Sequence, residues 1–296
     1  MFEIFETYLF AEKRYSEHTV AAYMLDVQSM FQFAQLEAFT DLHEVSHHTV
    51  RAWIVGLVEM NLSNRSINRK LSSLRTFFKW AKREGYIEFD PMARVKGPKQ
   101  EKRLPQFVKE DDLNSDRISE LFSSDFFGLR DQLMIELFYQ TGIRLSELVC
   151  LRENDVFNYS IKVLGKRNKE RIIPVSKELN LLVQKYLEVK SQEDFHTSYL
   201  VVTDKGNKLY PKFVYRKINY YLSLVTKLSK KSPHILRHTF ATHMLNNGAG
   251  LESLKEILGH ANLSATQVYT HNSFDKLTSI YKQAHPRGHK KNDYGY

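Results

Sequence analysis

Residues 232–244 read SPHILRHTFATHM and hold three histidines and one arginine within thirteen positions. Ser232 suits the N-cap of a helix and Pro233 its first turn, so the stretch predicts a helix that begins at Pro233. Gly248 lies where such a helix would end. This density of imidazoles fits a metal site, a group of buried structural histidines, or one half of an active site.

A metal site is the first alternative. His234 and His238 are four residues apart and would share one helix face, as two metal ligands should. A zinc-protease helix, however, has a glutamate directly after its first histidine, whereas residue 235 is isoleucine. No acidic residue lies nearby in the sequence to complete the three ligands of a catalytic zinc. We therefore expect no metal ion and no other cofactor.

The other side chains of this stretch divide between a core and a candidate site. His243 falls on the apolar side of the helix and is expected to be structural, whereas His238 is expected to support its neighbours through hydrogen bonds. His234 and Arg237 are three residues apart in the first part of the helix, where free N–H groups and the helix dipole favour an anion. The pair fits a phosphate site, and it also fits an ordinary ion pair.

The composition is that of a globular protein with a basic surface. The chain has 296 residues, enough for two domains, and no apolar run approaches the roughly 20 residues of a membrane span. Early acids at the N-terminus argue against a signal peptide, and the lone Cys150 allows no internal disulfide, so we expect a cytoplasmic protein. Residues 1–98 hold equal numbers of basic and acidic residues, which leaves the net charge of +9 in residues 99–296. This charge suits a polyanionic partner, or solubility alone.

Residues 1–94 are predicted to form a helical domain, with the clearest pattern in residues 61–83. Apolar residues recur there at helical spacing, at Ile67, Leu71, Leu74, Phe77, Phe78 and Ala81. The same segment has seven Lys or Arg residues and no acid. Its second face is therefore either a solvated surface or a phosphate-binding one, and the lack of acids for i,i+4 pairing favours phosphate. The candidate DNA contacts on this face are Arg65, Arg69, Lys70, Arg75 and Lys79.

A second domain is expected over residues 108–296, after a basic linker with two prolines and a glycine at 95–107. It begins with helices, followed by short strands at about 160–164 and 170–174 and a third strand at 198–203. Helices follow again, including a short one that Gly259 ends. A possible capping box, Ser264 with Gln267, begins the next helix.

Three further stretches complete a constellation around His234 and Arg237. TGIRLSEL places Arg144 at the start of a helix with Glu147 three residues on, and GKRNKER places Lys166 in the turn between the first two strands. LGHANLSATQVYTH places His260 just after a glycine-ended helix and Tyr269 nine residues later. Each motif alone has modest specificity.

Together, the order Arg, Lys, His-x-x-Arg, His, Tyr resembles the tyrosine recombinase family, most closely its Xer-type members. The resemblance covers the whole chain, from YSEHTVAAYMLDV near the N-terminus to AHPRG near the C-terminus. One departure is Arg167, where the Xer turn usually has glycine; it adds a candidate DNA contact beside Lys166. The resemblance implies a mainly α fold, with a helical core-binding domain and a mostly α catalytic domain that contains a small antiparallel sheet.

The resemblance also implies that Tyr269 cleaves a DNA strand and forms a 3′-phosphotyrosyl link. Arg144 and Arg237 would bind the phosphate, because guanidinium groups match its oxygens and keep their charge without a metal ion. The remaining implied roles are a further hydrogen bond to the phosphate from His260, acceptance of the tyrosine proton by His234, and protonation of the leaving oxygen by Lys166, with Lys169 as the alternative. Glu147 would orient a basic side chain of the site, and His238 would support it.

The partners that the resemblance implies are duplex DNA and further recombinase subunits. Four subunits, identical or of two homologous kinds, would act on two DNA sites, each docking its C-terminal helix, about Ser273–Lys282, onto a neighbour. A DNA translocase is a possible activator, and chromosome-dimer resolution in the nucleoid is the expected role. The alternatives are a mobile-element integrase, a non-catalytic DNA-binding homologue and a metal-dependent nuclease.

Overall fold

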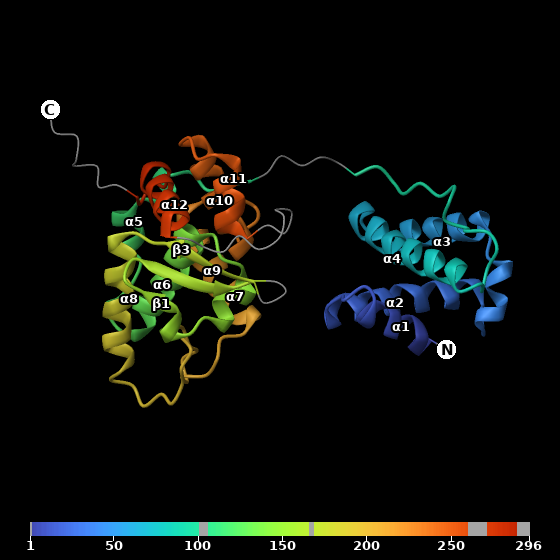
Figure 1. Ribbon diagram of the computed structural model, residues 1–296, viewed down its shortest axis with the longest axis horizontal. Helices are drawn as coiled ribbons and strands as arrows, with labels where there is room; N and C mark the ends of the chain where they lie inside the picture. The colour runs from blue at the N-terminus through green and yellow to red at the C-terminus, as the bar shows by residue number, and fades with distance from the viewer. Residues whose placement is uncertain (1, 101–105, 166–168, 260–270, 289–296) are drawn as a thin grey trace. The chain divides into compact units, whose positions relative to one another are not determined.

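The computed structural model describes residues 2–100, 106–165, 169–259 and 271–288. The chain divides into two compact units, residues 1–103 and 104–296, each with its own hydrophobic core. None of the described helices is long and apolar enough to cross a membrane. Both units are built mainly from helices (Figure 1), which confirms the predicted fold class.

The described residues of the first unit form four α-helices and one 3-10 helix. Their bounds are α1 Phe2–Ala11, α2 Glu17–Ala34, η1 Phe39–Glu44, α3 His47–Glu59 and α4 Asn64–Arg83. The hydroxyl of Ser63 accepts a hydrogen bond from the backbone N–H of Ser66 and so caps α4. All six apolar positions that the sequence places on one face of this helix are buried, as predicted.

The second unit surrounds helix α6, Phe126–Thr141, which is buried on nearly all sides and packs against both α8 and α10 (Figure 1). Its other elements are η2 Asp111–Leu113, α5 Ser115–Ser119, α7 Leu145–Cys150, η3 Glu153–Asp155, β1 Val156–Phe157, β2 Ser160–Leu164, β3 Glu170–Pro174, α8 Lys177–Lys190, α9 Pro211–Val225, α10 Pro233–Asn246, α11 Leu251–Leu258 and α12 His271–Ala284. The strands form one antiparallel sheet in the order β1-β2-β3.

The two predicted strands are confirmed as β2 and β3, which pair from Ser160 with Pro174 to Leu164 with Glu170. The prediction of a third strand at 198–203 is wrong: this segment forms only isolated bridges, from Tyr199 and Val202. The ammonium of Lys190 donates hydrogen bonds to the carbonyls of Tyr199 and Leu200, so a side chain satisfies backbone groups that a neighbouring strand would otherwise pair. The third strand of the sheet is instead β1, which has only two residues.

The chain between the two units follows the first unit for several residues. Val95 is buried in the core of that unit, and the amide of Asn68 donates a hydrogen bond to the carbonyl of Pro98 at 2.8 Å. On the other side of the gap, the backbone N–H of Val108 donates to the hydroxyl of Thr239 in the second unit. The linker at 95–107 stays a prediction.

Candidate active site

Arg144 begins helix α7, directly after the sharp turn that ends α6. Gly142 makes this turn in the left-handed region, with φ of 59°, and a Cβ there would lie 2.5 Å from the ring of Phe240. The backbone N–H and the guanidinium of Arg144 both donate to the carboxylate of Glu147, at 2.7 and 2.8 Å. One third of the Arg144 side chain is exposed. The turn thus presents a guanidinium that Glu147 holds in place and that remains partly open to solvent.

Arg237 reaches the same turn from helix α10, which begins at Pro233 as predicted. Its guanidinium donates hydrogen bonds to the carbonyl of Gly142 and, at 2.9 Å, to the carbonyl of Leu258. Burial, followed by the charge of Arg144, lowers the pKa of Arg237 to about 10. The group therefore remains positively charged at neutral pH, close to a second fixed cation.

The C-terminal end of helix α11 joins these arginines. Its last carbonyls, those of Ile257 and Leu258, and the carbonyl of Gly259 accept hydrogen bonds from three different arginines, namely Arg171, Arg237 and Arg144 in that order. The negative end of a helix dipole favours cations in this position. Three consecutive carbonyls thus gather three guanidinium groups at one point of the fold.

Glu147 is the counter-ion of this cluster. Only 5% of the residue is exposed, and its two carboxylate oxygens accept hydrogen bonds from both Arg144 and Arg171. Burial alone would raise the pKa of Glu147, but the hydrogen bonds and charge of Arg171, together with those from Arg144, lower it to about 2. One carboxylate therefore faces three guanidinium groups, and the excess positive charge suits an anion such as a DNA phosphate.

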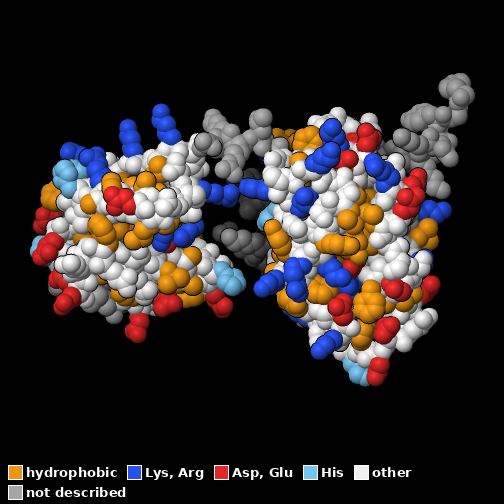
Figure 2. All heavy atoms as spheres, turned by 180° about the vertical axis from the view of Figure 1, so that it is seen from behind, with side chains coloured by type: hydrophobic (Ala, Val, Ile, Leu, Met, Phe, Trp, Pro, Cys, Tyr) orange, Lys and Arg blue, Asp and Glu red, His pale blue; other side chains and the backbone are white. Residues whose placement is uncertain are grey.

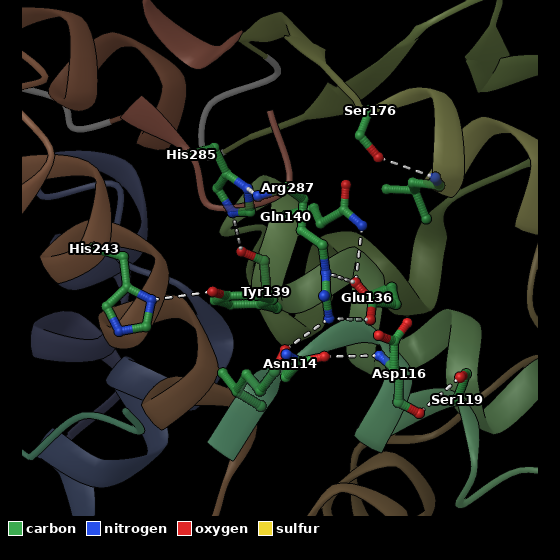
Figure 3. A network of polar contacts seen from close by, with 12 residues as sticks. Asn114, Asp116, Ser119, Glu136, Tyr139, Gln140, Ser176, His243, His285 and Arg287 are labelled. Carbon is green, nitrogen blue, oxygen red and sulfur yellow. Dashed lines mark hydrogen bonds and ion pairs between the residues drawn. The ribbon is translucent and has the colours of Figure 1, made fainter. Parts of the chain in front are cut away.

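The three histidines of α10 have different surroundings. His234 is exposed, while His238 is partly buried, and its Nε2 atom has no hydrogen-bond partner among the described residues. His243 is buried between the hydroxyl of Tyr139, 3.1 Å from Nδ1, and the carbonyl of Val108, 3.0 Å from Nε2. Figure 3 shows the contact between His243 and Tyr139. The structural role predicted for His243 is confirmed.

Four predicted site residues, Lys166, Arg167, His260 and Tyr269, lie outside the described residues, and their roles stay predictions. The residues on either side of the segment 166–168 are described. The N–H of Gly165 donates to the carbonyl of Lys169 at 2.8 Å at the end of the β2–β3 pair, and Lys169 itself is exposed.

Helix α12 packs on the core of its own domain, with Leu277 and Tyr281 buried. The hydroxyl of Tyr281 donates to the side-chain oxygen of Gln140, and the guanidinium of Arg287 pairs with Glu136 at 2.8 Å. Figure 3 shows the contact of Arg287 with Glu136 at the C-terminal half of α6. In a single chain the helix that was expected to dock on a neighbour is therefore held by its own domain.

The basic face of α4 is less open than the sequence suggests. Arg65, Arg69, Arg75 and Lys79 are exposed, but Arg69 and the partly buried Lys70 form ion pairs, at 2.6 and 3.0 Å, with a buried aspartate of α2, Asp26. Figure 2 shows Lys and Arg side chains mainly along the upper edge of the first unit, where α3 and α4 lie in Figure 1, and acidic side chains mainly along the lower edge.

Sequence reasoning missed Asp26 and Arg171. The acid that pairs with α4 comes from another helix, so the absence of acids within 61–83 could not reveal it. Arg171 did leave a signal in the sequence. It occupies a strand position two residues before the buried Ile173, and so on the same face of β3, where a charged residue requires a buried partner.

Comparisons with known proteins agree with this arrangement. The phage integrase family matches residues 106–276, and the phage integrase N-terminal SAM-like domain matches residues 2–85. The tyrosine recombinase XerC of Anoxybacillus flavithermus (strain DSM 21510 / WK1) is 38% identical over 291 residues, which cover 96% of this chain and 97% of the relative. XerC of Bacillus subtilis (strain 168) is 38% identical over 307 residues, with 98% and 97% covered.

Two solved structures show the same fold at low sequence identity. The XerH site-specific recombinase bound to a palindromic difH substrate has a TM-score of 0.70 at 21% identity, covering 88% of this chain and 78% of that chain. The Tn1549 transposon integrase in complex with circular intermediate DNA has a TM-score of 0.67 at 18% identity, covering 92% and 96%. With both units matched by family models and with XerC relatives 38% identical over nearly the whole chain, the chain belongs to the phage integrase family and is a tyrosine recombinase.

Proposed function

We propose that this recombinase cuts and rejoins duplex DNA at a specific site through a covalent tyrosine intermediate. The observation that carries the proposal is the convergence of Arg144 and Arg237 on adjacent carbonyls at the end of α11, one residue before His260 in the sequence. Two fixed guanidinium groups can neutralise the charge that gathers on the non-bridging oxygens of a phosphodiester during in-line attack.

In the proposed reaction, the phenolic oxygen of Tyr269 attacks the phosphorus and the bond to the 5′-oxygen breaks. His234 accepts the phenol proton, and Lys166 donates a proton to the leaving 5′-oxygen, so the 5′ end leaves as a neutral hydroxyl and the phosphotyrosyl diester keeps the single negative charge of the original phosphodiester. Forming phenolate at pH 7 costs roughly 4 kcal/mol from an unperturbed pKa near 10, a cost that surrounding cations reduce. The phosphotyrosyl link stores the energy of the broken bond for religation.

The proposed substrate is a pair of DNA sites held by four subunits, and the proposed role is the resolution of chromosome dimers in the nucleoid. The identity with XerC proteins over nearly the whole chain supports this role over that of a mobile-element integrase. The subunits would be copies of this chain or of a homologous recombinase, and a DNA translocase would activate them. Exchange of α12 between neighbours would require that Leu277 and Tyr281 leave the core of their own domain.

A nicked suicide substrate tests the chemistry. Cleavage at the nick releases a short 5′-hydroxyl fragment that diffuses away, so the covalent protein–DNA complex accumulates and is counted on a denaturing gel. We expect Tyr269→Phe to abolish the complex, and the control Tyr159→Phe, which removes the hydroxyl of a different tyrosine that is exposed, to retain it. A persistent complex in Tyr269→Phe would overturn the assignment of the nucleophile, and loss of cleavage in EDTA would favour a metal-dependent nuclease.

A further inference from the structure

Arg171 is a buried cation that shares the carboxylate of Glu147 with the partly exposed Arg144. It lies on strand β3, and only 3% of the residue is exposed. Its Nη1 and Nη2 atoms donate to the two oxygens of Glu147, at 2.8 and 2.9 Å, while its Nε donates to the carbonyl of Ile257 at 2.7 Å. Every nitrogen of this guanidinium therefore has a fixed partner, and none of these partners is solvent.

Three segments that carry or adjoin the candidate site meet on this side chain. Through Glu147 it contacts the carboxylate that holds both the backbone and the guanidinium of Arg144. Through Ile257 it holds the end of α11, and a Cβ at Gly259 would lie 3.1 Å from its Nη1. A Cβ at Gly165, the residue that follows β2, would lie 3.5 Å from the same nitrogen.

The charge of Arg171 matters as much as its contacts. Without it, Arg144 would be the only described arginine in an ion pair with Glu147, and the carboxylate would offset most of the positive charge that Arg144 presents to an anion. With it, the carboxylate is shared between two guanidinium groups and the cluster keeps its excess positive charge. The buried Arg171 thus leaves the partly exposed Arg144 available to a phosphate.

We infer that Arg171 is a positioning residue for strand cleavage, which fixes Arg144 through Glu147 and aligns the end of α11 with Gly165, the residue that follows β2. This inference rests on the proposed contact between Arg144 and the DNA phosphate. A lysine could not replace it, because one ammonium cannot span both carboxylate oxygens and a carbonyl on the adjacent helix.

The test compares Arg171→Lys with Arg130→Lys. Arg130 is also a fully buried arginine of this domain, paired with Asp131 and Asp204, but its ion pairs include no residue of the candidate site. Both variants are measured as full chains, below the midpoint of their unfolding transitions. The readouts are the Kd for duplex DNA and the single-turnover cleavage rate constant on the suicide substrate at saturating protein.

We expect Arg171→Lys to lower the cleavage rate constant about 100-fold, the effect of misplacing a group by about 1 Å, with Kd changed by less than about threefold. Arg130→Lys should leave the rate constant within about threefold of the wild-type value. Equal rate losses in the two variants would overturn the inference, because they would show a general effect of a weakened domain.

A second substrate separates positioning from stability. When a methylphosphonate replaces the scissile phosphate, the reacting group has no negative charge for an arginine to neutralise. The rate penalty of Arg171→Lys should then shrink at least about tenfold, in parallel with that of Arg144→Ala, since both act on the same charge. A penalty of the same size on both substrates would contradict positioning through Arg144.

Two further variants keep the test decisive. If Arg171→Lys does not fold, Glu147→Asp shortens the same link by one methylene and should show the same pattern. Arg144→Ala distinguishes the proposed phosphate contact of Arg144 from the positioning role of Arg171. Wild-type cleavage by Arg144→Ala would refute the proposed phosphate contact itself, whereas slow Arg144→Ala with normal Arg171→Lys would refute only the role of Arg171.

Discussion

Replacing Glu147 by glutamine removes the one negative charge of the arginine cluster and preserves its shape. The pKa of Glu147 is lowered from 4.5 to about 2, so its ionised form stabilises the folded domain by about 3 kcal/mol relative to the protonated form. Removing one partner of a buried ion pair costs about the same amount, because Arg171 would remain buried without a counter-ion. We expect Glu147→Gln to lower the free energy of unfolding of the second unit by about 3 kcal/mol at pH 7.

The effect has a defined pH dependence. A carboxyl group with a lowered folded-state pKa contributes stability that is fully present above its unfolded-state value and is lost as the pH falls towards its folded-state value. The difference between the wild type and Glu147→Gln should therefore be constant above about pH 5 and should narrow by about 1.4 kcal/mol per pH unit below about pH 4.5. The exposed Glu252 provides the control, since Glu252→Gln should change stability by less than about 0.5 kcal/mol.

Urea unfolding with two probes measures this. Both tryptophans, Trp53 and Trp80, lie in the first unit, so tryptophan fluorescence reports on that unit, while circular dichroism at 222 nm reports on the helices of both. Glu147→Gln should shift the dichroism transition of the second unit and leave the fluorescence transition unchanged. A loss below about 1 kcal/mol, or a difference that does not vary between pH 5 and pH 3, would refute the account of this ion pair.

Three other predictions concern single residues of the two units. Asp26→Asn should lower the stability of the first unit by about 3 kcal/mol, seen in the fluorescence transition, because it strips a buried carboxylate from two cations; an unchanged midpoint would contradict this. Gly248→Ala, at φ 89° with no neighbour within 4 Å, should lower the free energy of unfolding measured by dichroism by about 1 kcal/mol. Gly259→Ala, at φ 64° and beside Arg171, should lower it by at least twice as much and should also slow cleavage. Equal losses of stability in the two variants would disprove the close contact. Lys79→Gln should reduce the slope of log Kd against log salt by about 1 for duplex DNA, and an unchanged slope would remove it from the DNA surface.

Local patterns in the sequence were sufficient for most elements of the fold. The patterns in residues 160–164 and 170–174 predicted both long strands. Gly259 lies directly after the helix that it was expected to end, and Gly248 lies two residues after the end of α10. These signals depend on neighbouring residues alone. The strand prediction for residues 198–203 was wrong because the apolar residues of this segment are buried without a strand partner. Lys190, eight residues before the start of the segment, donates hydrogen bonds to its carbonyls instead.

In the candidate site, too, the sequence predicted local features but not the long-range contacts. The order of motifs identified Arg144 and Arg237, but only the folded chain shows that consecutive carbonyls of α11 hold both. Long-range ion pairs, such as Asp26 with Arg69 or Glu147 with Arg171, join residues that are 43 and 24 positions apart, and no local spacing encodes them. The packing of α12 on its own domain likewise depends on contacts with α6 that are distant in the sequence.

The identity of the residue that becomes covalently linked to DNA is the most direct test of cleavage by Tyr269. Trypsin cleaves this chain after Lys255 and Lys276, so residues 256–276 form one peptide, and Tyr269 is its only tyrosine. After reaction with a suicide substrate and digestion with nuclease and trypsin, mass spectrometry should find the nucleotide adduct on this peptide, with fragment ions that place it on Tyr269. An adduct on any other residue, or DNA cleavage with no adduct at all, would contradict the account.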